Sequence, residues 1–198
     1  MRLLPYGPRA LLAEFSSLGE VLVAAAALRD ASVAGVVDIV PAMRTVLVVH
    51  DGADLALVEA ALRTGGEELP APTGTVRLRV HYDGPDLEAV AAAAGLTIDQ
   101  VVSLHCGTAH RVAFCGFLPG FAYMTGLPAE LQLPRRRSPR PLVAAGSVAI
   151  ADGFTGIYPV DSPGGWHILG STQVVLWDAR REVPGLLVPG ADVVFEAV

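Results

Sequence analysis

The sequence predicts a small α+β unit of the ferredoxin-like kind, followed by a mainly β unit built as a closed or sandwiched sheet. Three observations predict this fold class. Strand-like and helix-like segments alternate over residues 10–63, and a glycine- and proline-rich segment follows at Thr64–Gly74. Beyond it, glycine or proline interrupts short apolar runs about every ten residues. We therefore expect one domain at residues 1–70 and another at residues 75–198.

The first unit is predicted from its alternating segments. Strands are expected at Ala10–Phe15, Val36–Val40 and Thr45–Val49, and helices at Leu18–Arg29 and Asp54–Arg63. Ser16 or Ser17 is placed to cap the first helix, and the turn Pro41–Arg44 joins the last two strands as a hairpin. A strand, a helix, two strands and a helix open a ferredoxin-like unit, so a further strand must complete its sheet.

The second unit begins with the alternating pattern TVRLRVH at Thr75–His81, which predicts a strand buried on one face. Two short helices are expected next, at Leu87–Ala94 and Ile98–Cys106, with Thr97 capping the second. Later strands are expected at Val143–Ile150, Ile157–Tyr158, His167–Leu169, Val174–Trp177 and Val193–Phe195. Short strands at this spacing are typical of a closed or sandwiched sheet.

Charge excludes several classes of partner. The formal net charge is −6, which disfavours broad attraction to nucleic acid or to an anionic membrane. All 14 basic residues are arginines. The chain therefore offers no Walker-A lysine, no lysine Schiff base and no biotinyl-lysine. Any anion it binds must be held by arginine, histidine or backbone N–H groups.

Cysteine usage and the first residues predict a cytoplasmic protein. Cys106 and Cys115 do not form a CxxC pair, so buried reduced thiols are expected. The start, MRLLPYGPRA, has no apolar stretch typical of a signal peptide. No apolar run approaches the roughly 20 residues that span a bilayer.

Three glycine- and proline-rich segments stand out in the second unit: Gly116–Met124, Pro134–Pro159 and Ser162–Thr172. In the third, two glycines precede Trp166. Glycine lets the backbone approach another group closely, and tryptophan supplies a large rigid face. This combination predicts the floor of a pocket or a flat docking surface. Tight turns of a barrel, with aromatic side chains filling its core, are the alternative interpretation.

Arginines gather in the second segment, at Arg135, Arg136, Arg137 and Arg140. Guanidinium groups match a carboxylate or phosphate partner, while a solvated loop is the alternative. Ser147 lies in AAGSVA, which is not the GxSxG motif of a serine nucleophile. No histidine pair has the spacing of a metal site, so no metal is predicted.

At these segments the chain resembles the KipI-type family, also called allophanate hydrolase subunit 1 and, in bacteria, the B subunit of 5-oxoprolinase. The family pattern runs GFxPGFxYL, PRxxxPRxxVPAGSVAIA and GIYPxxSPGGWxxIGRT. Matching residues are Gly116, Phe117, Pro119, Gly120, Phe121 and Tyr123; then Pro134, Arg135, Pro139, Arg140, Gly146, Ser147 and Val148; then Gly156, Ile157, Tyr158, Pro159, Ser162, Pro163, Gly164, Gly165, Trp166, Gly170 and Thr172. Met124, Ala144 and Ser171 depart from it, and Ser171 replaces an arginine that would offer an anion contact.

The resemblance implies a small α+β domain followed by a cyclophilin-like, carboxyltransferase-type barrel. It also implies a subunit of an ATP-dependent 5-oxoprolinase, working with a KipA-type subunit and a LamB/YcsF-type subunit. ATP would phosphorylate the lactam oxygen of 5-oxoproline, and water would open the ring to glutamate. A regulatory module that inhibits a sensor histidine kinase and a subunit for allophanate or the urea pathway are the alternatives.

Site residues are assigned by position within the matching segments. His105, which corresponds to a histidine preceding the first motif, and Arg140 are the candidate catalytic residues. The expected substrate-binding residues are Phe117, Pro119, Gly120, Phe121, Tyr123, Arg135, Tyr158, Pro163, Gly164, Gly165 and Trp166. We expect the three segments to meet in one aromatic-lined recess, with ATP bound by the multi-subunit complex.

Overall fold

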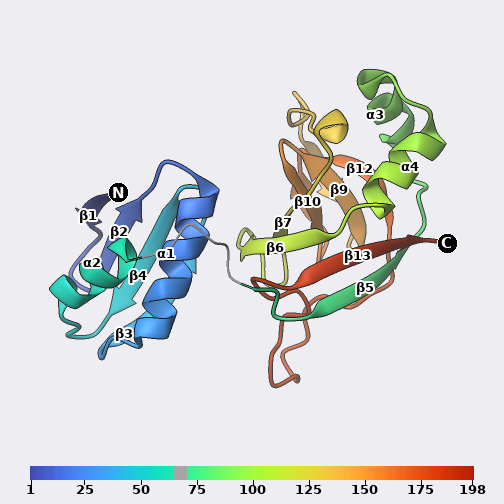
Figure 1. The fold of residues 1–198 in the computed structure, drawn as a ribbon. Helices are drawn as coiled ribbons and strands as arrows, with labels where there is room; N and C mark the ends of the chain where they lie inside the picture. Colours follow the sequence, from blue (N-terminus) through green and yellow to red (C-terminus); the bar gives the residue numbers. More distant parts are fainter. Residues whose placement is uncertain (65–70) are drawn as a thin grey trace. The chain divides into compact units, whose positions relative to one another are not determined.

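The computed structural model describes residues 1–64 and 71–198 and divides them between two compact units, Met1–Ala71 and Pro72–Val198 (Figure 1). Each unit has a hydrophobic core of its own. Of the predicted linker Thr64–Gly74, residues 65–70 lie outside the described residues.

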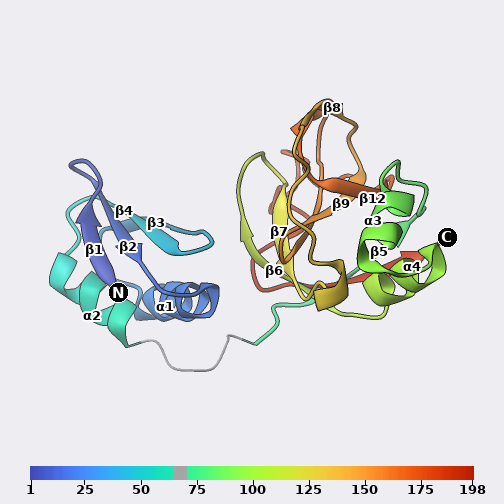
Figure 2. The same cartoon turned by 90° about the horizontal axis from the view of Figure 1, so that it is seen from above.

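The first unit is a four-stranded antiparallel sheet with two helices on one face (Figure 2). Its elements are β1 (Arg2–Pro5), β2 (Ala10–Glu14), α1 (Leu18–Ala31), β3 (Val36–Pro41), β4 (Thr45–His50) and α2 (Leu55–Arg63). The predicted cap of α1 is present, because the Ser17 side chain accepts a hydrogen bond from the Glu20 N–H. Asp54 caps α2 and accepts a hydrogen bond from the Ala56 N–H.

Strand β1 was not predicted from the sequence, and it is the further strand that completes this sheet. The order is β1-β2-β4-β3, and β1 pairs antiparallel with β2 from Arg2 opposite Glu14 to Pro5 opposite Leu11. This is the edge at which a ferredoxin-like order places its last strand. The completing strand is therefore formed by residues that precede β2 in the chain. It was missed because these four residues are too few to show an alternating apolar pattern.

The second unit contains a larger sheet and two helices. Its elements are β5 (Thr75–Val80), α3 (Leu87–Ala94), α4 (Ile98–Cys106), β6 (His110–Cys115), β7 (Ala122–Thr125), the 3-10 turn η1 (Ala129–Leu131), β8 (Arg140–Val143), β9 (Ser147–Ala151), β10 (Phe154–Ile157), β11 (Ser162–Gly164), β12 (His167–Ser171) and β13 (Asp192–Ala197). Seven strands form one sheet in the order β12-β9-β10-β7-β6-β13-β5, and β8 pairs with β11 as a separate ribbon.

The seven-stranded sheet curls into a nearly closed barrel (Figure 1). Its two ends meet where His81, just after β5, exchanges backbone hydrogen bonds of 2.9 and 2.8 Å with Ser171 of β12. Gly170 makes this closure possible, because a Cβ at that position would lie 2.2 Å from the His81 carbonyl oxygen. The mixed α and β architecture with a barrel-like sheet is therefore confirmed.

Two of the predicted strands are wrong. The expected strand Val143–Ile150 is divided between β8 and β9, because Gly146 takes a φ of +81° and its N–H bonds to the Tyr158 carbonyl. The expected strand Val174–Trp177 is absent, and only an isolated bridge joins Trp177 to Gly185. The predicted cap of α4 at Thr97 is confirmed, and Thr97 forms a capping box with Gln100.

No single helix within residues 1–64 and 71–198 is long and apolar enough to cross a membrane. Helices α3 and α4 reach that length and composition only when taken together, and they are bent by 92° at their junction.

Candidate functional site

The three glycine- and proline-rich segments meet in one recess of the second unit, with a cavity volume of about 110 Å³. The residues that line it are Phe117, Phe121, Tyr123, Arg135, Tyr158, Pro163, Gly164, Gly165 and Trp166. Each segment contributes to the lining, so the expected convergence is confirmed. All the predicted substrate-binding residues except Pro119 and Gly120 lie in the recess.

Aromatic rings in mutual contact build its wall. Phe121 stands at the centre and is 2% exposed. Its ring meets Phe117, Tyr158 and Trp166 edge to face, at centroid distances of 5.5, 5.4 and 5.5 Å. Tyr123 packs against both Phe121 and Trp166, at 5.1 and 5.6 Å. Such edge-to-face contacts fix the rings in place, so the recess is largely preformed.

The paired glycines have different physical roles. At Gly164 a Cβ would lie 2.2 Å from the Tyr158 hydroxyl oxygen, so only glycine lets the backbone pass beside this buried ring. At Gly165 the nearest atom would be 3.8 Å away, in Pro139. Gly164 therefore gives the third segment its close approach to the aromatic wall, and Gly165 has no steric need to be glycine.

Arg135 is the only charged residue among those lining the recess. Its guanidinium carbon lies 5.9 Å from the centre of the Trp166 ring, within the range of a cation–π contact. Asp152 is 3.7 Å from Arg135 Nε, which is too long for a hydrogen bond, and both side chains are half exposed. The guanidinium therefore keeps donors available for an anionic ligand.

Asp86, which no sequence motif marks, holds the segments around the recess together. The side chain is 3% exposed. Its Oδ1 accepts hydrogen bonds from Arg136 and from Arg140 at 2.7 Å. Its Oδ2 accepts from Arg140 and from the Ile168 N–H, both at 2.8 Å. One carboxylate thus joins the arginine-rich segment to strand β12.

Asp86, Arg136, Arg140 and the Ile168 N–H form what we call the Asp86 clamp, and backbone hydrogen bonds connect this clamp to the recess. The Arg136 N–H donates to the Gly165 carbonyl at 2.8 Å, and Arg140 of β8 lies opposite Gly164 of β11. Burial acts to raise the pKa of Asp86, but the bonds from Arg140 and Ile168 and the two guanidinium charges outweigh it. The pKa of Asp86 consequently lies below its ordinary value, and the carboxylate is ionised at neutral pH.

Arg140, Pro119 and Gly120 do not line the recess. Arg140 is bound by Asp86 through two hydrogen bonds and instead borders a separate hollow of about 340 Å³ that also includes Asp83 and Ser171. Gly120 takes a φ of +86° and lies close to Trp177 and the Leu176 backbone. Arg140, a candidate catalytic residue from the sequence, therefore lies outside the aromatic recess.

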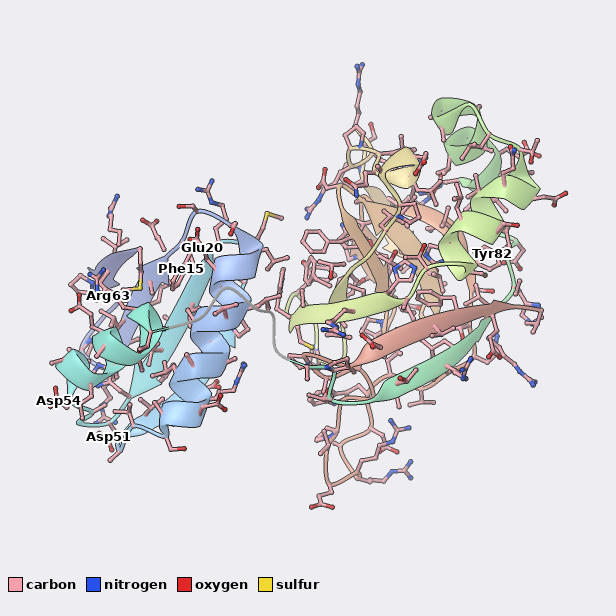
Figure 3. The ribbon with its side chains drawn as sticks, viewed as in Figure 1. Phe15, Glu20, Asp51, Asp54, Arg63 and Tyr82 are labelled. Atoms are coloured by element: carbon pink, nitrogen blue, oxygen red, sulfur yellow. The ribbon has the colours of Figure 1, made fainter. Side chains whose placement is uncertain are left out.

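His105 lies in the core of the barrel unit and is fully buried. Nδ1 is 2.7 Å from the Tyr82 hydroxyl, and Nε2 is 3.2 Å from Thr155 Oγ1. Figure 3 shows Tyr82 beside α4, the helix that carries His105. The imidazole stacks on Phe195 at 4.6 Å. Because both ring nitrogens have protein partners away from the recess, these contacts favour a structural role for His105.

Two larger hollows, of about 440 Å³ each, lie on the first unit. One lies between α1 and β3, and the other is lined by Phe15, Glu20 and Arg63 among others (Figure 3). Neither includes a residue of the three motif segments. In the part of the chain that the structure describes, no group of three or more His, Cys, Asp or Glu side chains could hold a metal ion.

Comparison with known proteins identifies the family. The family model described as the carboxyltransferase domain, subdomain C and D, matches residues 1–187. The B subunit of 5-oxoprolinase from Escherichia coli O157:H7 is 40% identical over 168 residues, which is 81% of this chain and 77% of that protein. The protein of the same name from Bacillus subtilis (strain 168) is 38% identical over 141 residues, 70% of this chain and 59% of the relative.

Solved structures show the same fold. TTHA0988 matches with a TM-score of 0.82 and 35% identity over 96% of this chain, which spans 40% of that longer chain. A conserved uncharacterized protein from Pyrococcus horikoshii, PH0987, matches with a TM-score of 0.60 and 34% identity, covering 100% of this chain and 97% of that one. The Kluyveromyces lactis urea carboxylase, at 18% identity and a TM-score of 0.75, shares the fold over 99% of this chain and 21% of its own.

The two glycines provide a matched test of the recess. We expect Gly164→Ala to lower the free energy of unfolding by about 1–3 kcal/mol, because the new methyl group overlaps the buried Tyr158 hydroxyl. Gly165→Ala, one residue away, should change it by less than about 0.5 kcal/mol. Chemical denaturation of both variants measures this difference. Equal effects of the two substitutions would contradict the assigned contact.

Removing the Asp86 carboxylate should destabilise the second unit. Asp86→Asn leaves two partly buried guanidinium groups without their counter-charge, which we expect to cost about 3 kcal/mol of unfolding free energy. Glu196→Gln, in the exposed pair with Arg77 of the same unit, is the control and should have little effect. Urea unfolding monitored by tryptophan fluorescence provides the measurement. A loss for Asp86→Asn no larger than that of the control would show that the clamp contributes nothing.

The buried histidines should make stability depend on pH. Burial lowers the pKa of His105 well below 6.5 and also lowers the pKa of His110. The unfolded chain therefore binds more protons than the folded chain once the pH falls below about 6.5, so stability is present above that pH and is lost on acidification. Each histidine adds a slope of up to about 1.4 kcal/mol per pH unit.

Unfolding free energies measured between pH 7.5 and 5 test this dependence. His105→Gln should lower stability at neutral pH but reduce the slope, because glutamine does not titrate. A wild-type curve that is flat over this range, or a variant with an unchanged slope, would exclude His105 as the source.

Proposed function

This chain belongs to the carboxyltransferase-domain family, subdomains C and D, which includes the B subunit of 5-oxoprolinase, and we propose that it serves as that subunit in an ATP-dependent 5-oxoprolinase. The observation that carries the proposal is the recess itself: one available guanidinium, Arg135, beside preformed aromatic faces. 5-Oxoproline is a small, nearly flat lactam with one carboxylate, and these features match that combination.

We propose that Arg135 binds the substrate carboxylate through a forked pair of charge-assisted hydrogen bonds. The lactam ring would then lie against Trp166, which is 5% exposed and held edge-on by Phe121. The cavity volume of about 110 Å³ lies below the roughly 300–1,000 Å³ of sites for drug-sized ligands. A molecule the size of 5-oxoproline suits it.

Tyr158, which is 2% exposed, supplies a neutral polar group in the wall of the recess. Burial raises the pKa of Tyr158, while a hydrogen bond from the Trp166 backbone N–H and the Arg135 and Arg140 charges act in the opposite direction. The phenol therefore keeps its proton at neutral pH, and its hydroxyl can orient a lactam N–H or carbonyl. The Gly164 backbone beside it leaves no room for a side chain there.

ATP does not fit the recess, which is smaller than the sites of drug-sized ligands and has a single cation. We therefore propose that ATP binds elsewhere in the assembled enzyme and activates the lactam oxygen. The part of this chain is to bind and orient 5-oxoproline and to exclude water from the aromatic wall. Arg140 positions this wall through Asp86, and His105 supports the barrel core.

The names of the relatives, which describe one subunit of an enzyme, imply partners. We propose a KipA-type subunit and a LamB/YcsF-type subunit, assembled with this chain in the cytoplasm. We further propose that residues 1–70 and 75–198 are separate domains and that the barrel is cyclophilin-like. The two compact units and the closure of the sheet at His81 and Ser171 support these assignments.

The test is 5-oxoproline-dependent ADP release by this chain assembled with both partners. Arg135→Gln should raise KM by about 10- to 100-fold, the equivalent of a lost charge-assisted hydrogen bond. Arg137→Gln, which removes the same charge from an exposed side chain outside the recess, is the control and should behave as wild type. Turnover of allophanate but not of 5-oxoproline, or an Arg135→Gln enzyme with wild-type KM, would contradict the assignment.

A further inference from the structure

Phe117 is held in an unfavourable backbone conformation. Its φ is +70°, and the Leu118 N–H donates to the Gly116 carbonyl at 2.9 Å, two residues back. This is a γ-turn with a positive central φ, a rare and strained form, and a bulky aromatic residue seldom occupies it. The other non-glycine residues with positive φ among those described are Ser32 and Asp152, which are small and polar.

Packing in the core does not account for this strain. The Phe117 side chain is 59% exposed, whereas Phe121 of the same segment is 2% exposed. Glycine at position 117 would adopt the same φ without strain. The chain instead places a large apolar ring, mostly in solvent, at the rim of the recess, with its edge on Phe121.

The surrounding turn fixes the direction of the ring. The Phe121 N–H donates to the Leu118 carbonyl at 2.9 Å, and the Gly116 N–H donates to the Phe121 carbonyl at 3.2 Å. Gly120, with a φ of +86°, seats the turn against Trp177. Strain that is fixed in this way is typical of functional sites.

We infer that Phe117 is a specificity-determining residue whose ring covers the outer face of the bound lactam and limits the size of ring that the recess accepts. The inference rests on the proposed function, since it takes a cyclic amide carboxylate as the ligand. The carboxylate lies at Arg135, the inner face of the lactam lies on Trp166, and Phe117 closes the outer side. We expect a five-membered lactam to occupy the space between the two rings and its six-membered homologue to be disfavoured.

The experiment compares 5-oxoproline with 6-oxopiperidine-2-carboxylate, the six-membered homologue, in ADP-release assays of the assembled enzyme. Phe117→Ala and Phe117→Gly both remove the ring, and Phe117→Tyr keeps it. We expect both truncations to raise KM for 5-oxoproline and to lower the ratio of kcat/KM between the two substrates by about tenfold, the effect of one methylene in a fitted pocket. Phe117→Tyr should retain the wild-type ratio.

The glycine variant separates contact from folding. Because glycine accepts the positive φ, Phe117→Gly should be at least as stable to thermal unfolding as Phe117→Ala while showing the same loss of discrimination. Truncated variants that keep the wild-type ratio would overturn the role of Phe117 and leave the proposed function intact. An assembled wild-type enzyme with no 5-oxoproline turnover would overturn the proposed function and this inference with it.

Discussion

The recess depends on one buried carboxylate. Asp86 accepts hydrogen bonds from two arginines of one segment and from the Ile168 N–H, so it joins the arginine-rich segment to strand β12. A buried ion pair is often no better for stability than apolar packing, so its value here is positional. It holds the arginine-rich segment beside Gly164 and Gly165, and it occupies donors of Arg136 and Arg140 with hydrogen bonds. Arg135 is the cation that lines the recess.

The recess beside the Asp86 clamp has a wall of packed aromatic rings and one charged side chain, Arg135. Aromatic rings that meet edge to face need no rearrangement to receive a flat ligand, and preorganisation of this kind lowers the cost of binding. In our proposal, the Arg135 guanidinium beside the Trp166 indole binds a small anion with a planar body. We propose that Phe117, whose ring is held in a strained turn, limits this space on one side, while the Gly164 backbone passes close to Tyr158 on the other. Shape and charge therefore point to the same small class of ligand.

Much of this was predictable from local pattern. The helices of the first unit, its hairpin and the convergence of the three segments follow from periodicity, capping residues and motif order. Features set by distant contacts were not predictable. No sequence motif marks Asp86, since its partners are 50, 54 and 82 residues away. Arg140 was assigned to the site from its place in the motif. Sequence spacing does not show on which face of a β-ribbon a side chain lies, so its binding to Asp86 could not be foreseen. The strand expected at Val174–Trp177 has the right residues but finds no partner strand.

The most direct test of this account is a crystal structure of the chain assembled with its partner subunits and 5-oxoproline. We expect the ligand carboxylate within hydrogen-bond distance of Arg135, the lactam ring between Trp166 and Phe117, and Arg140 still bound to Asp86. A ligand found elsewhere, such as in the hollow bordered by Asp83 and Ser171, with the aromatic recess empty, would contradict the central claim.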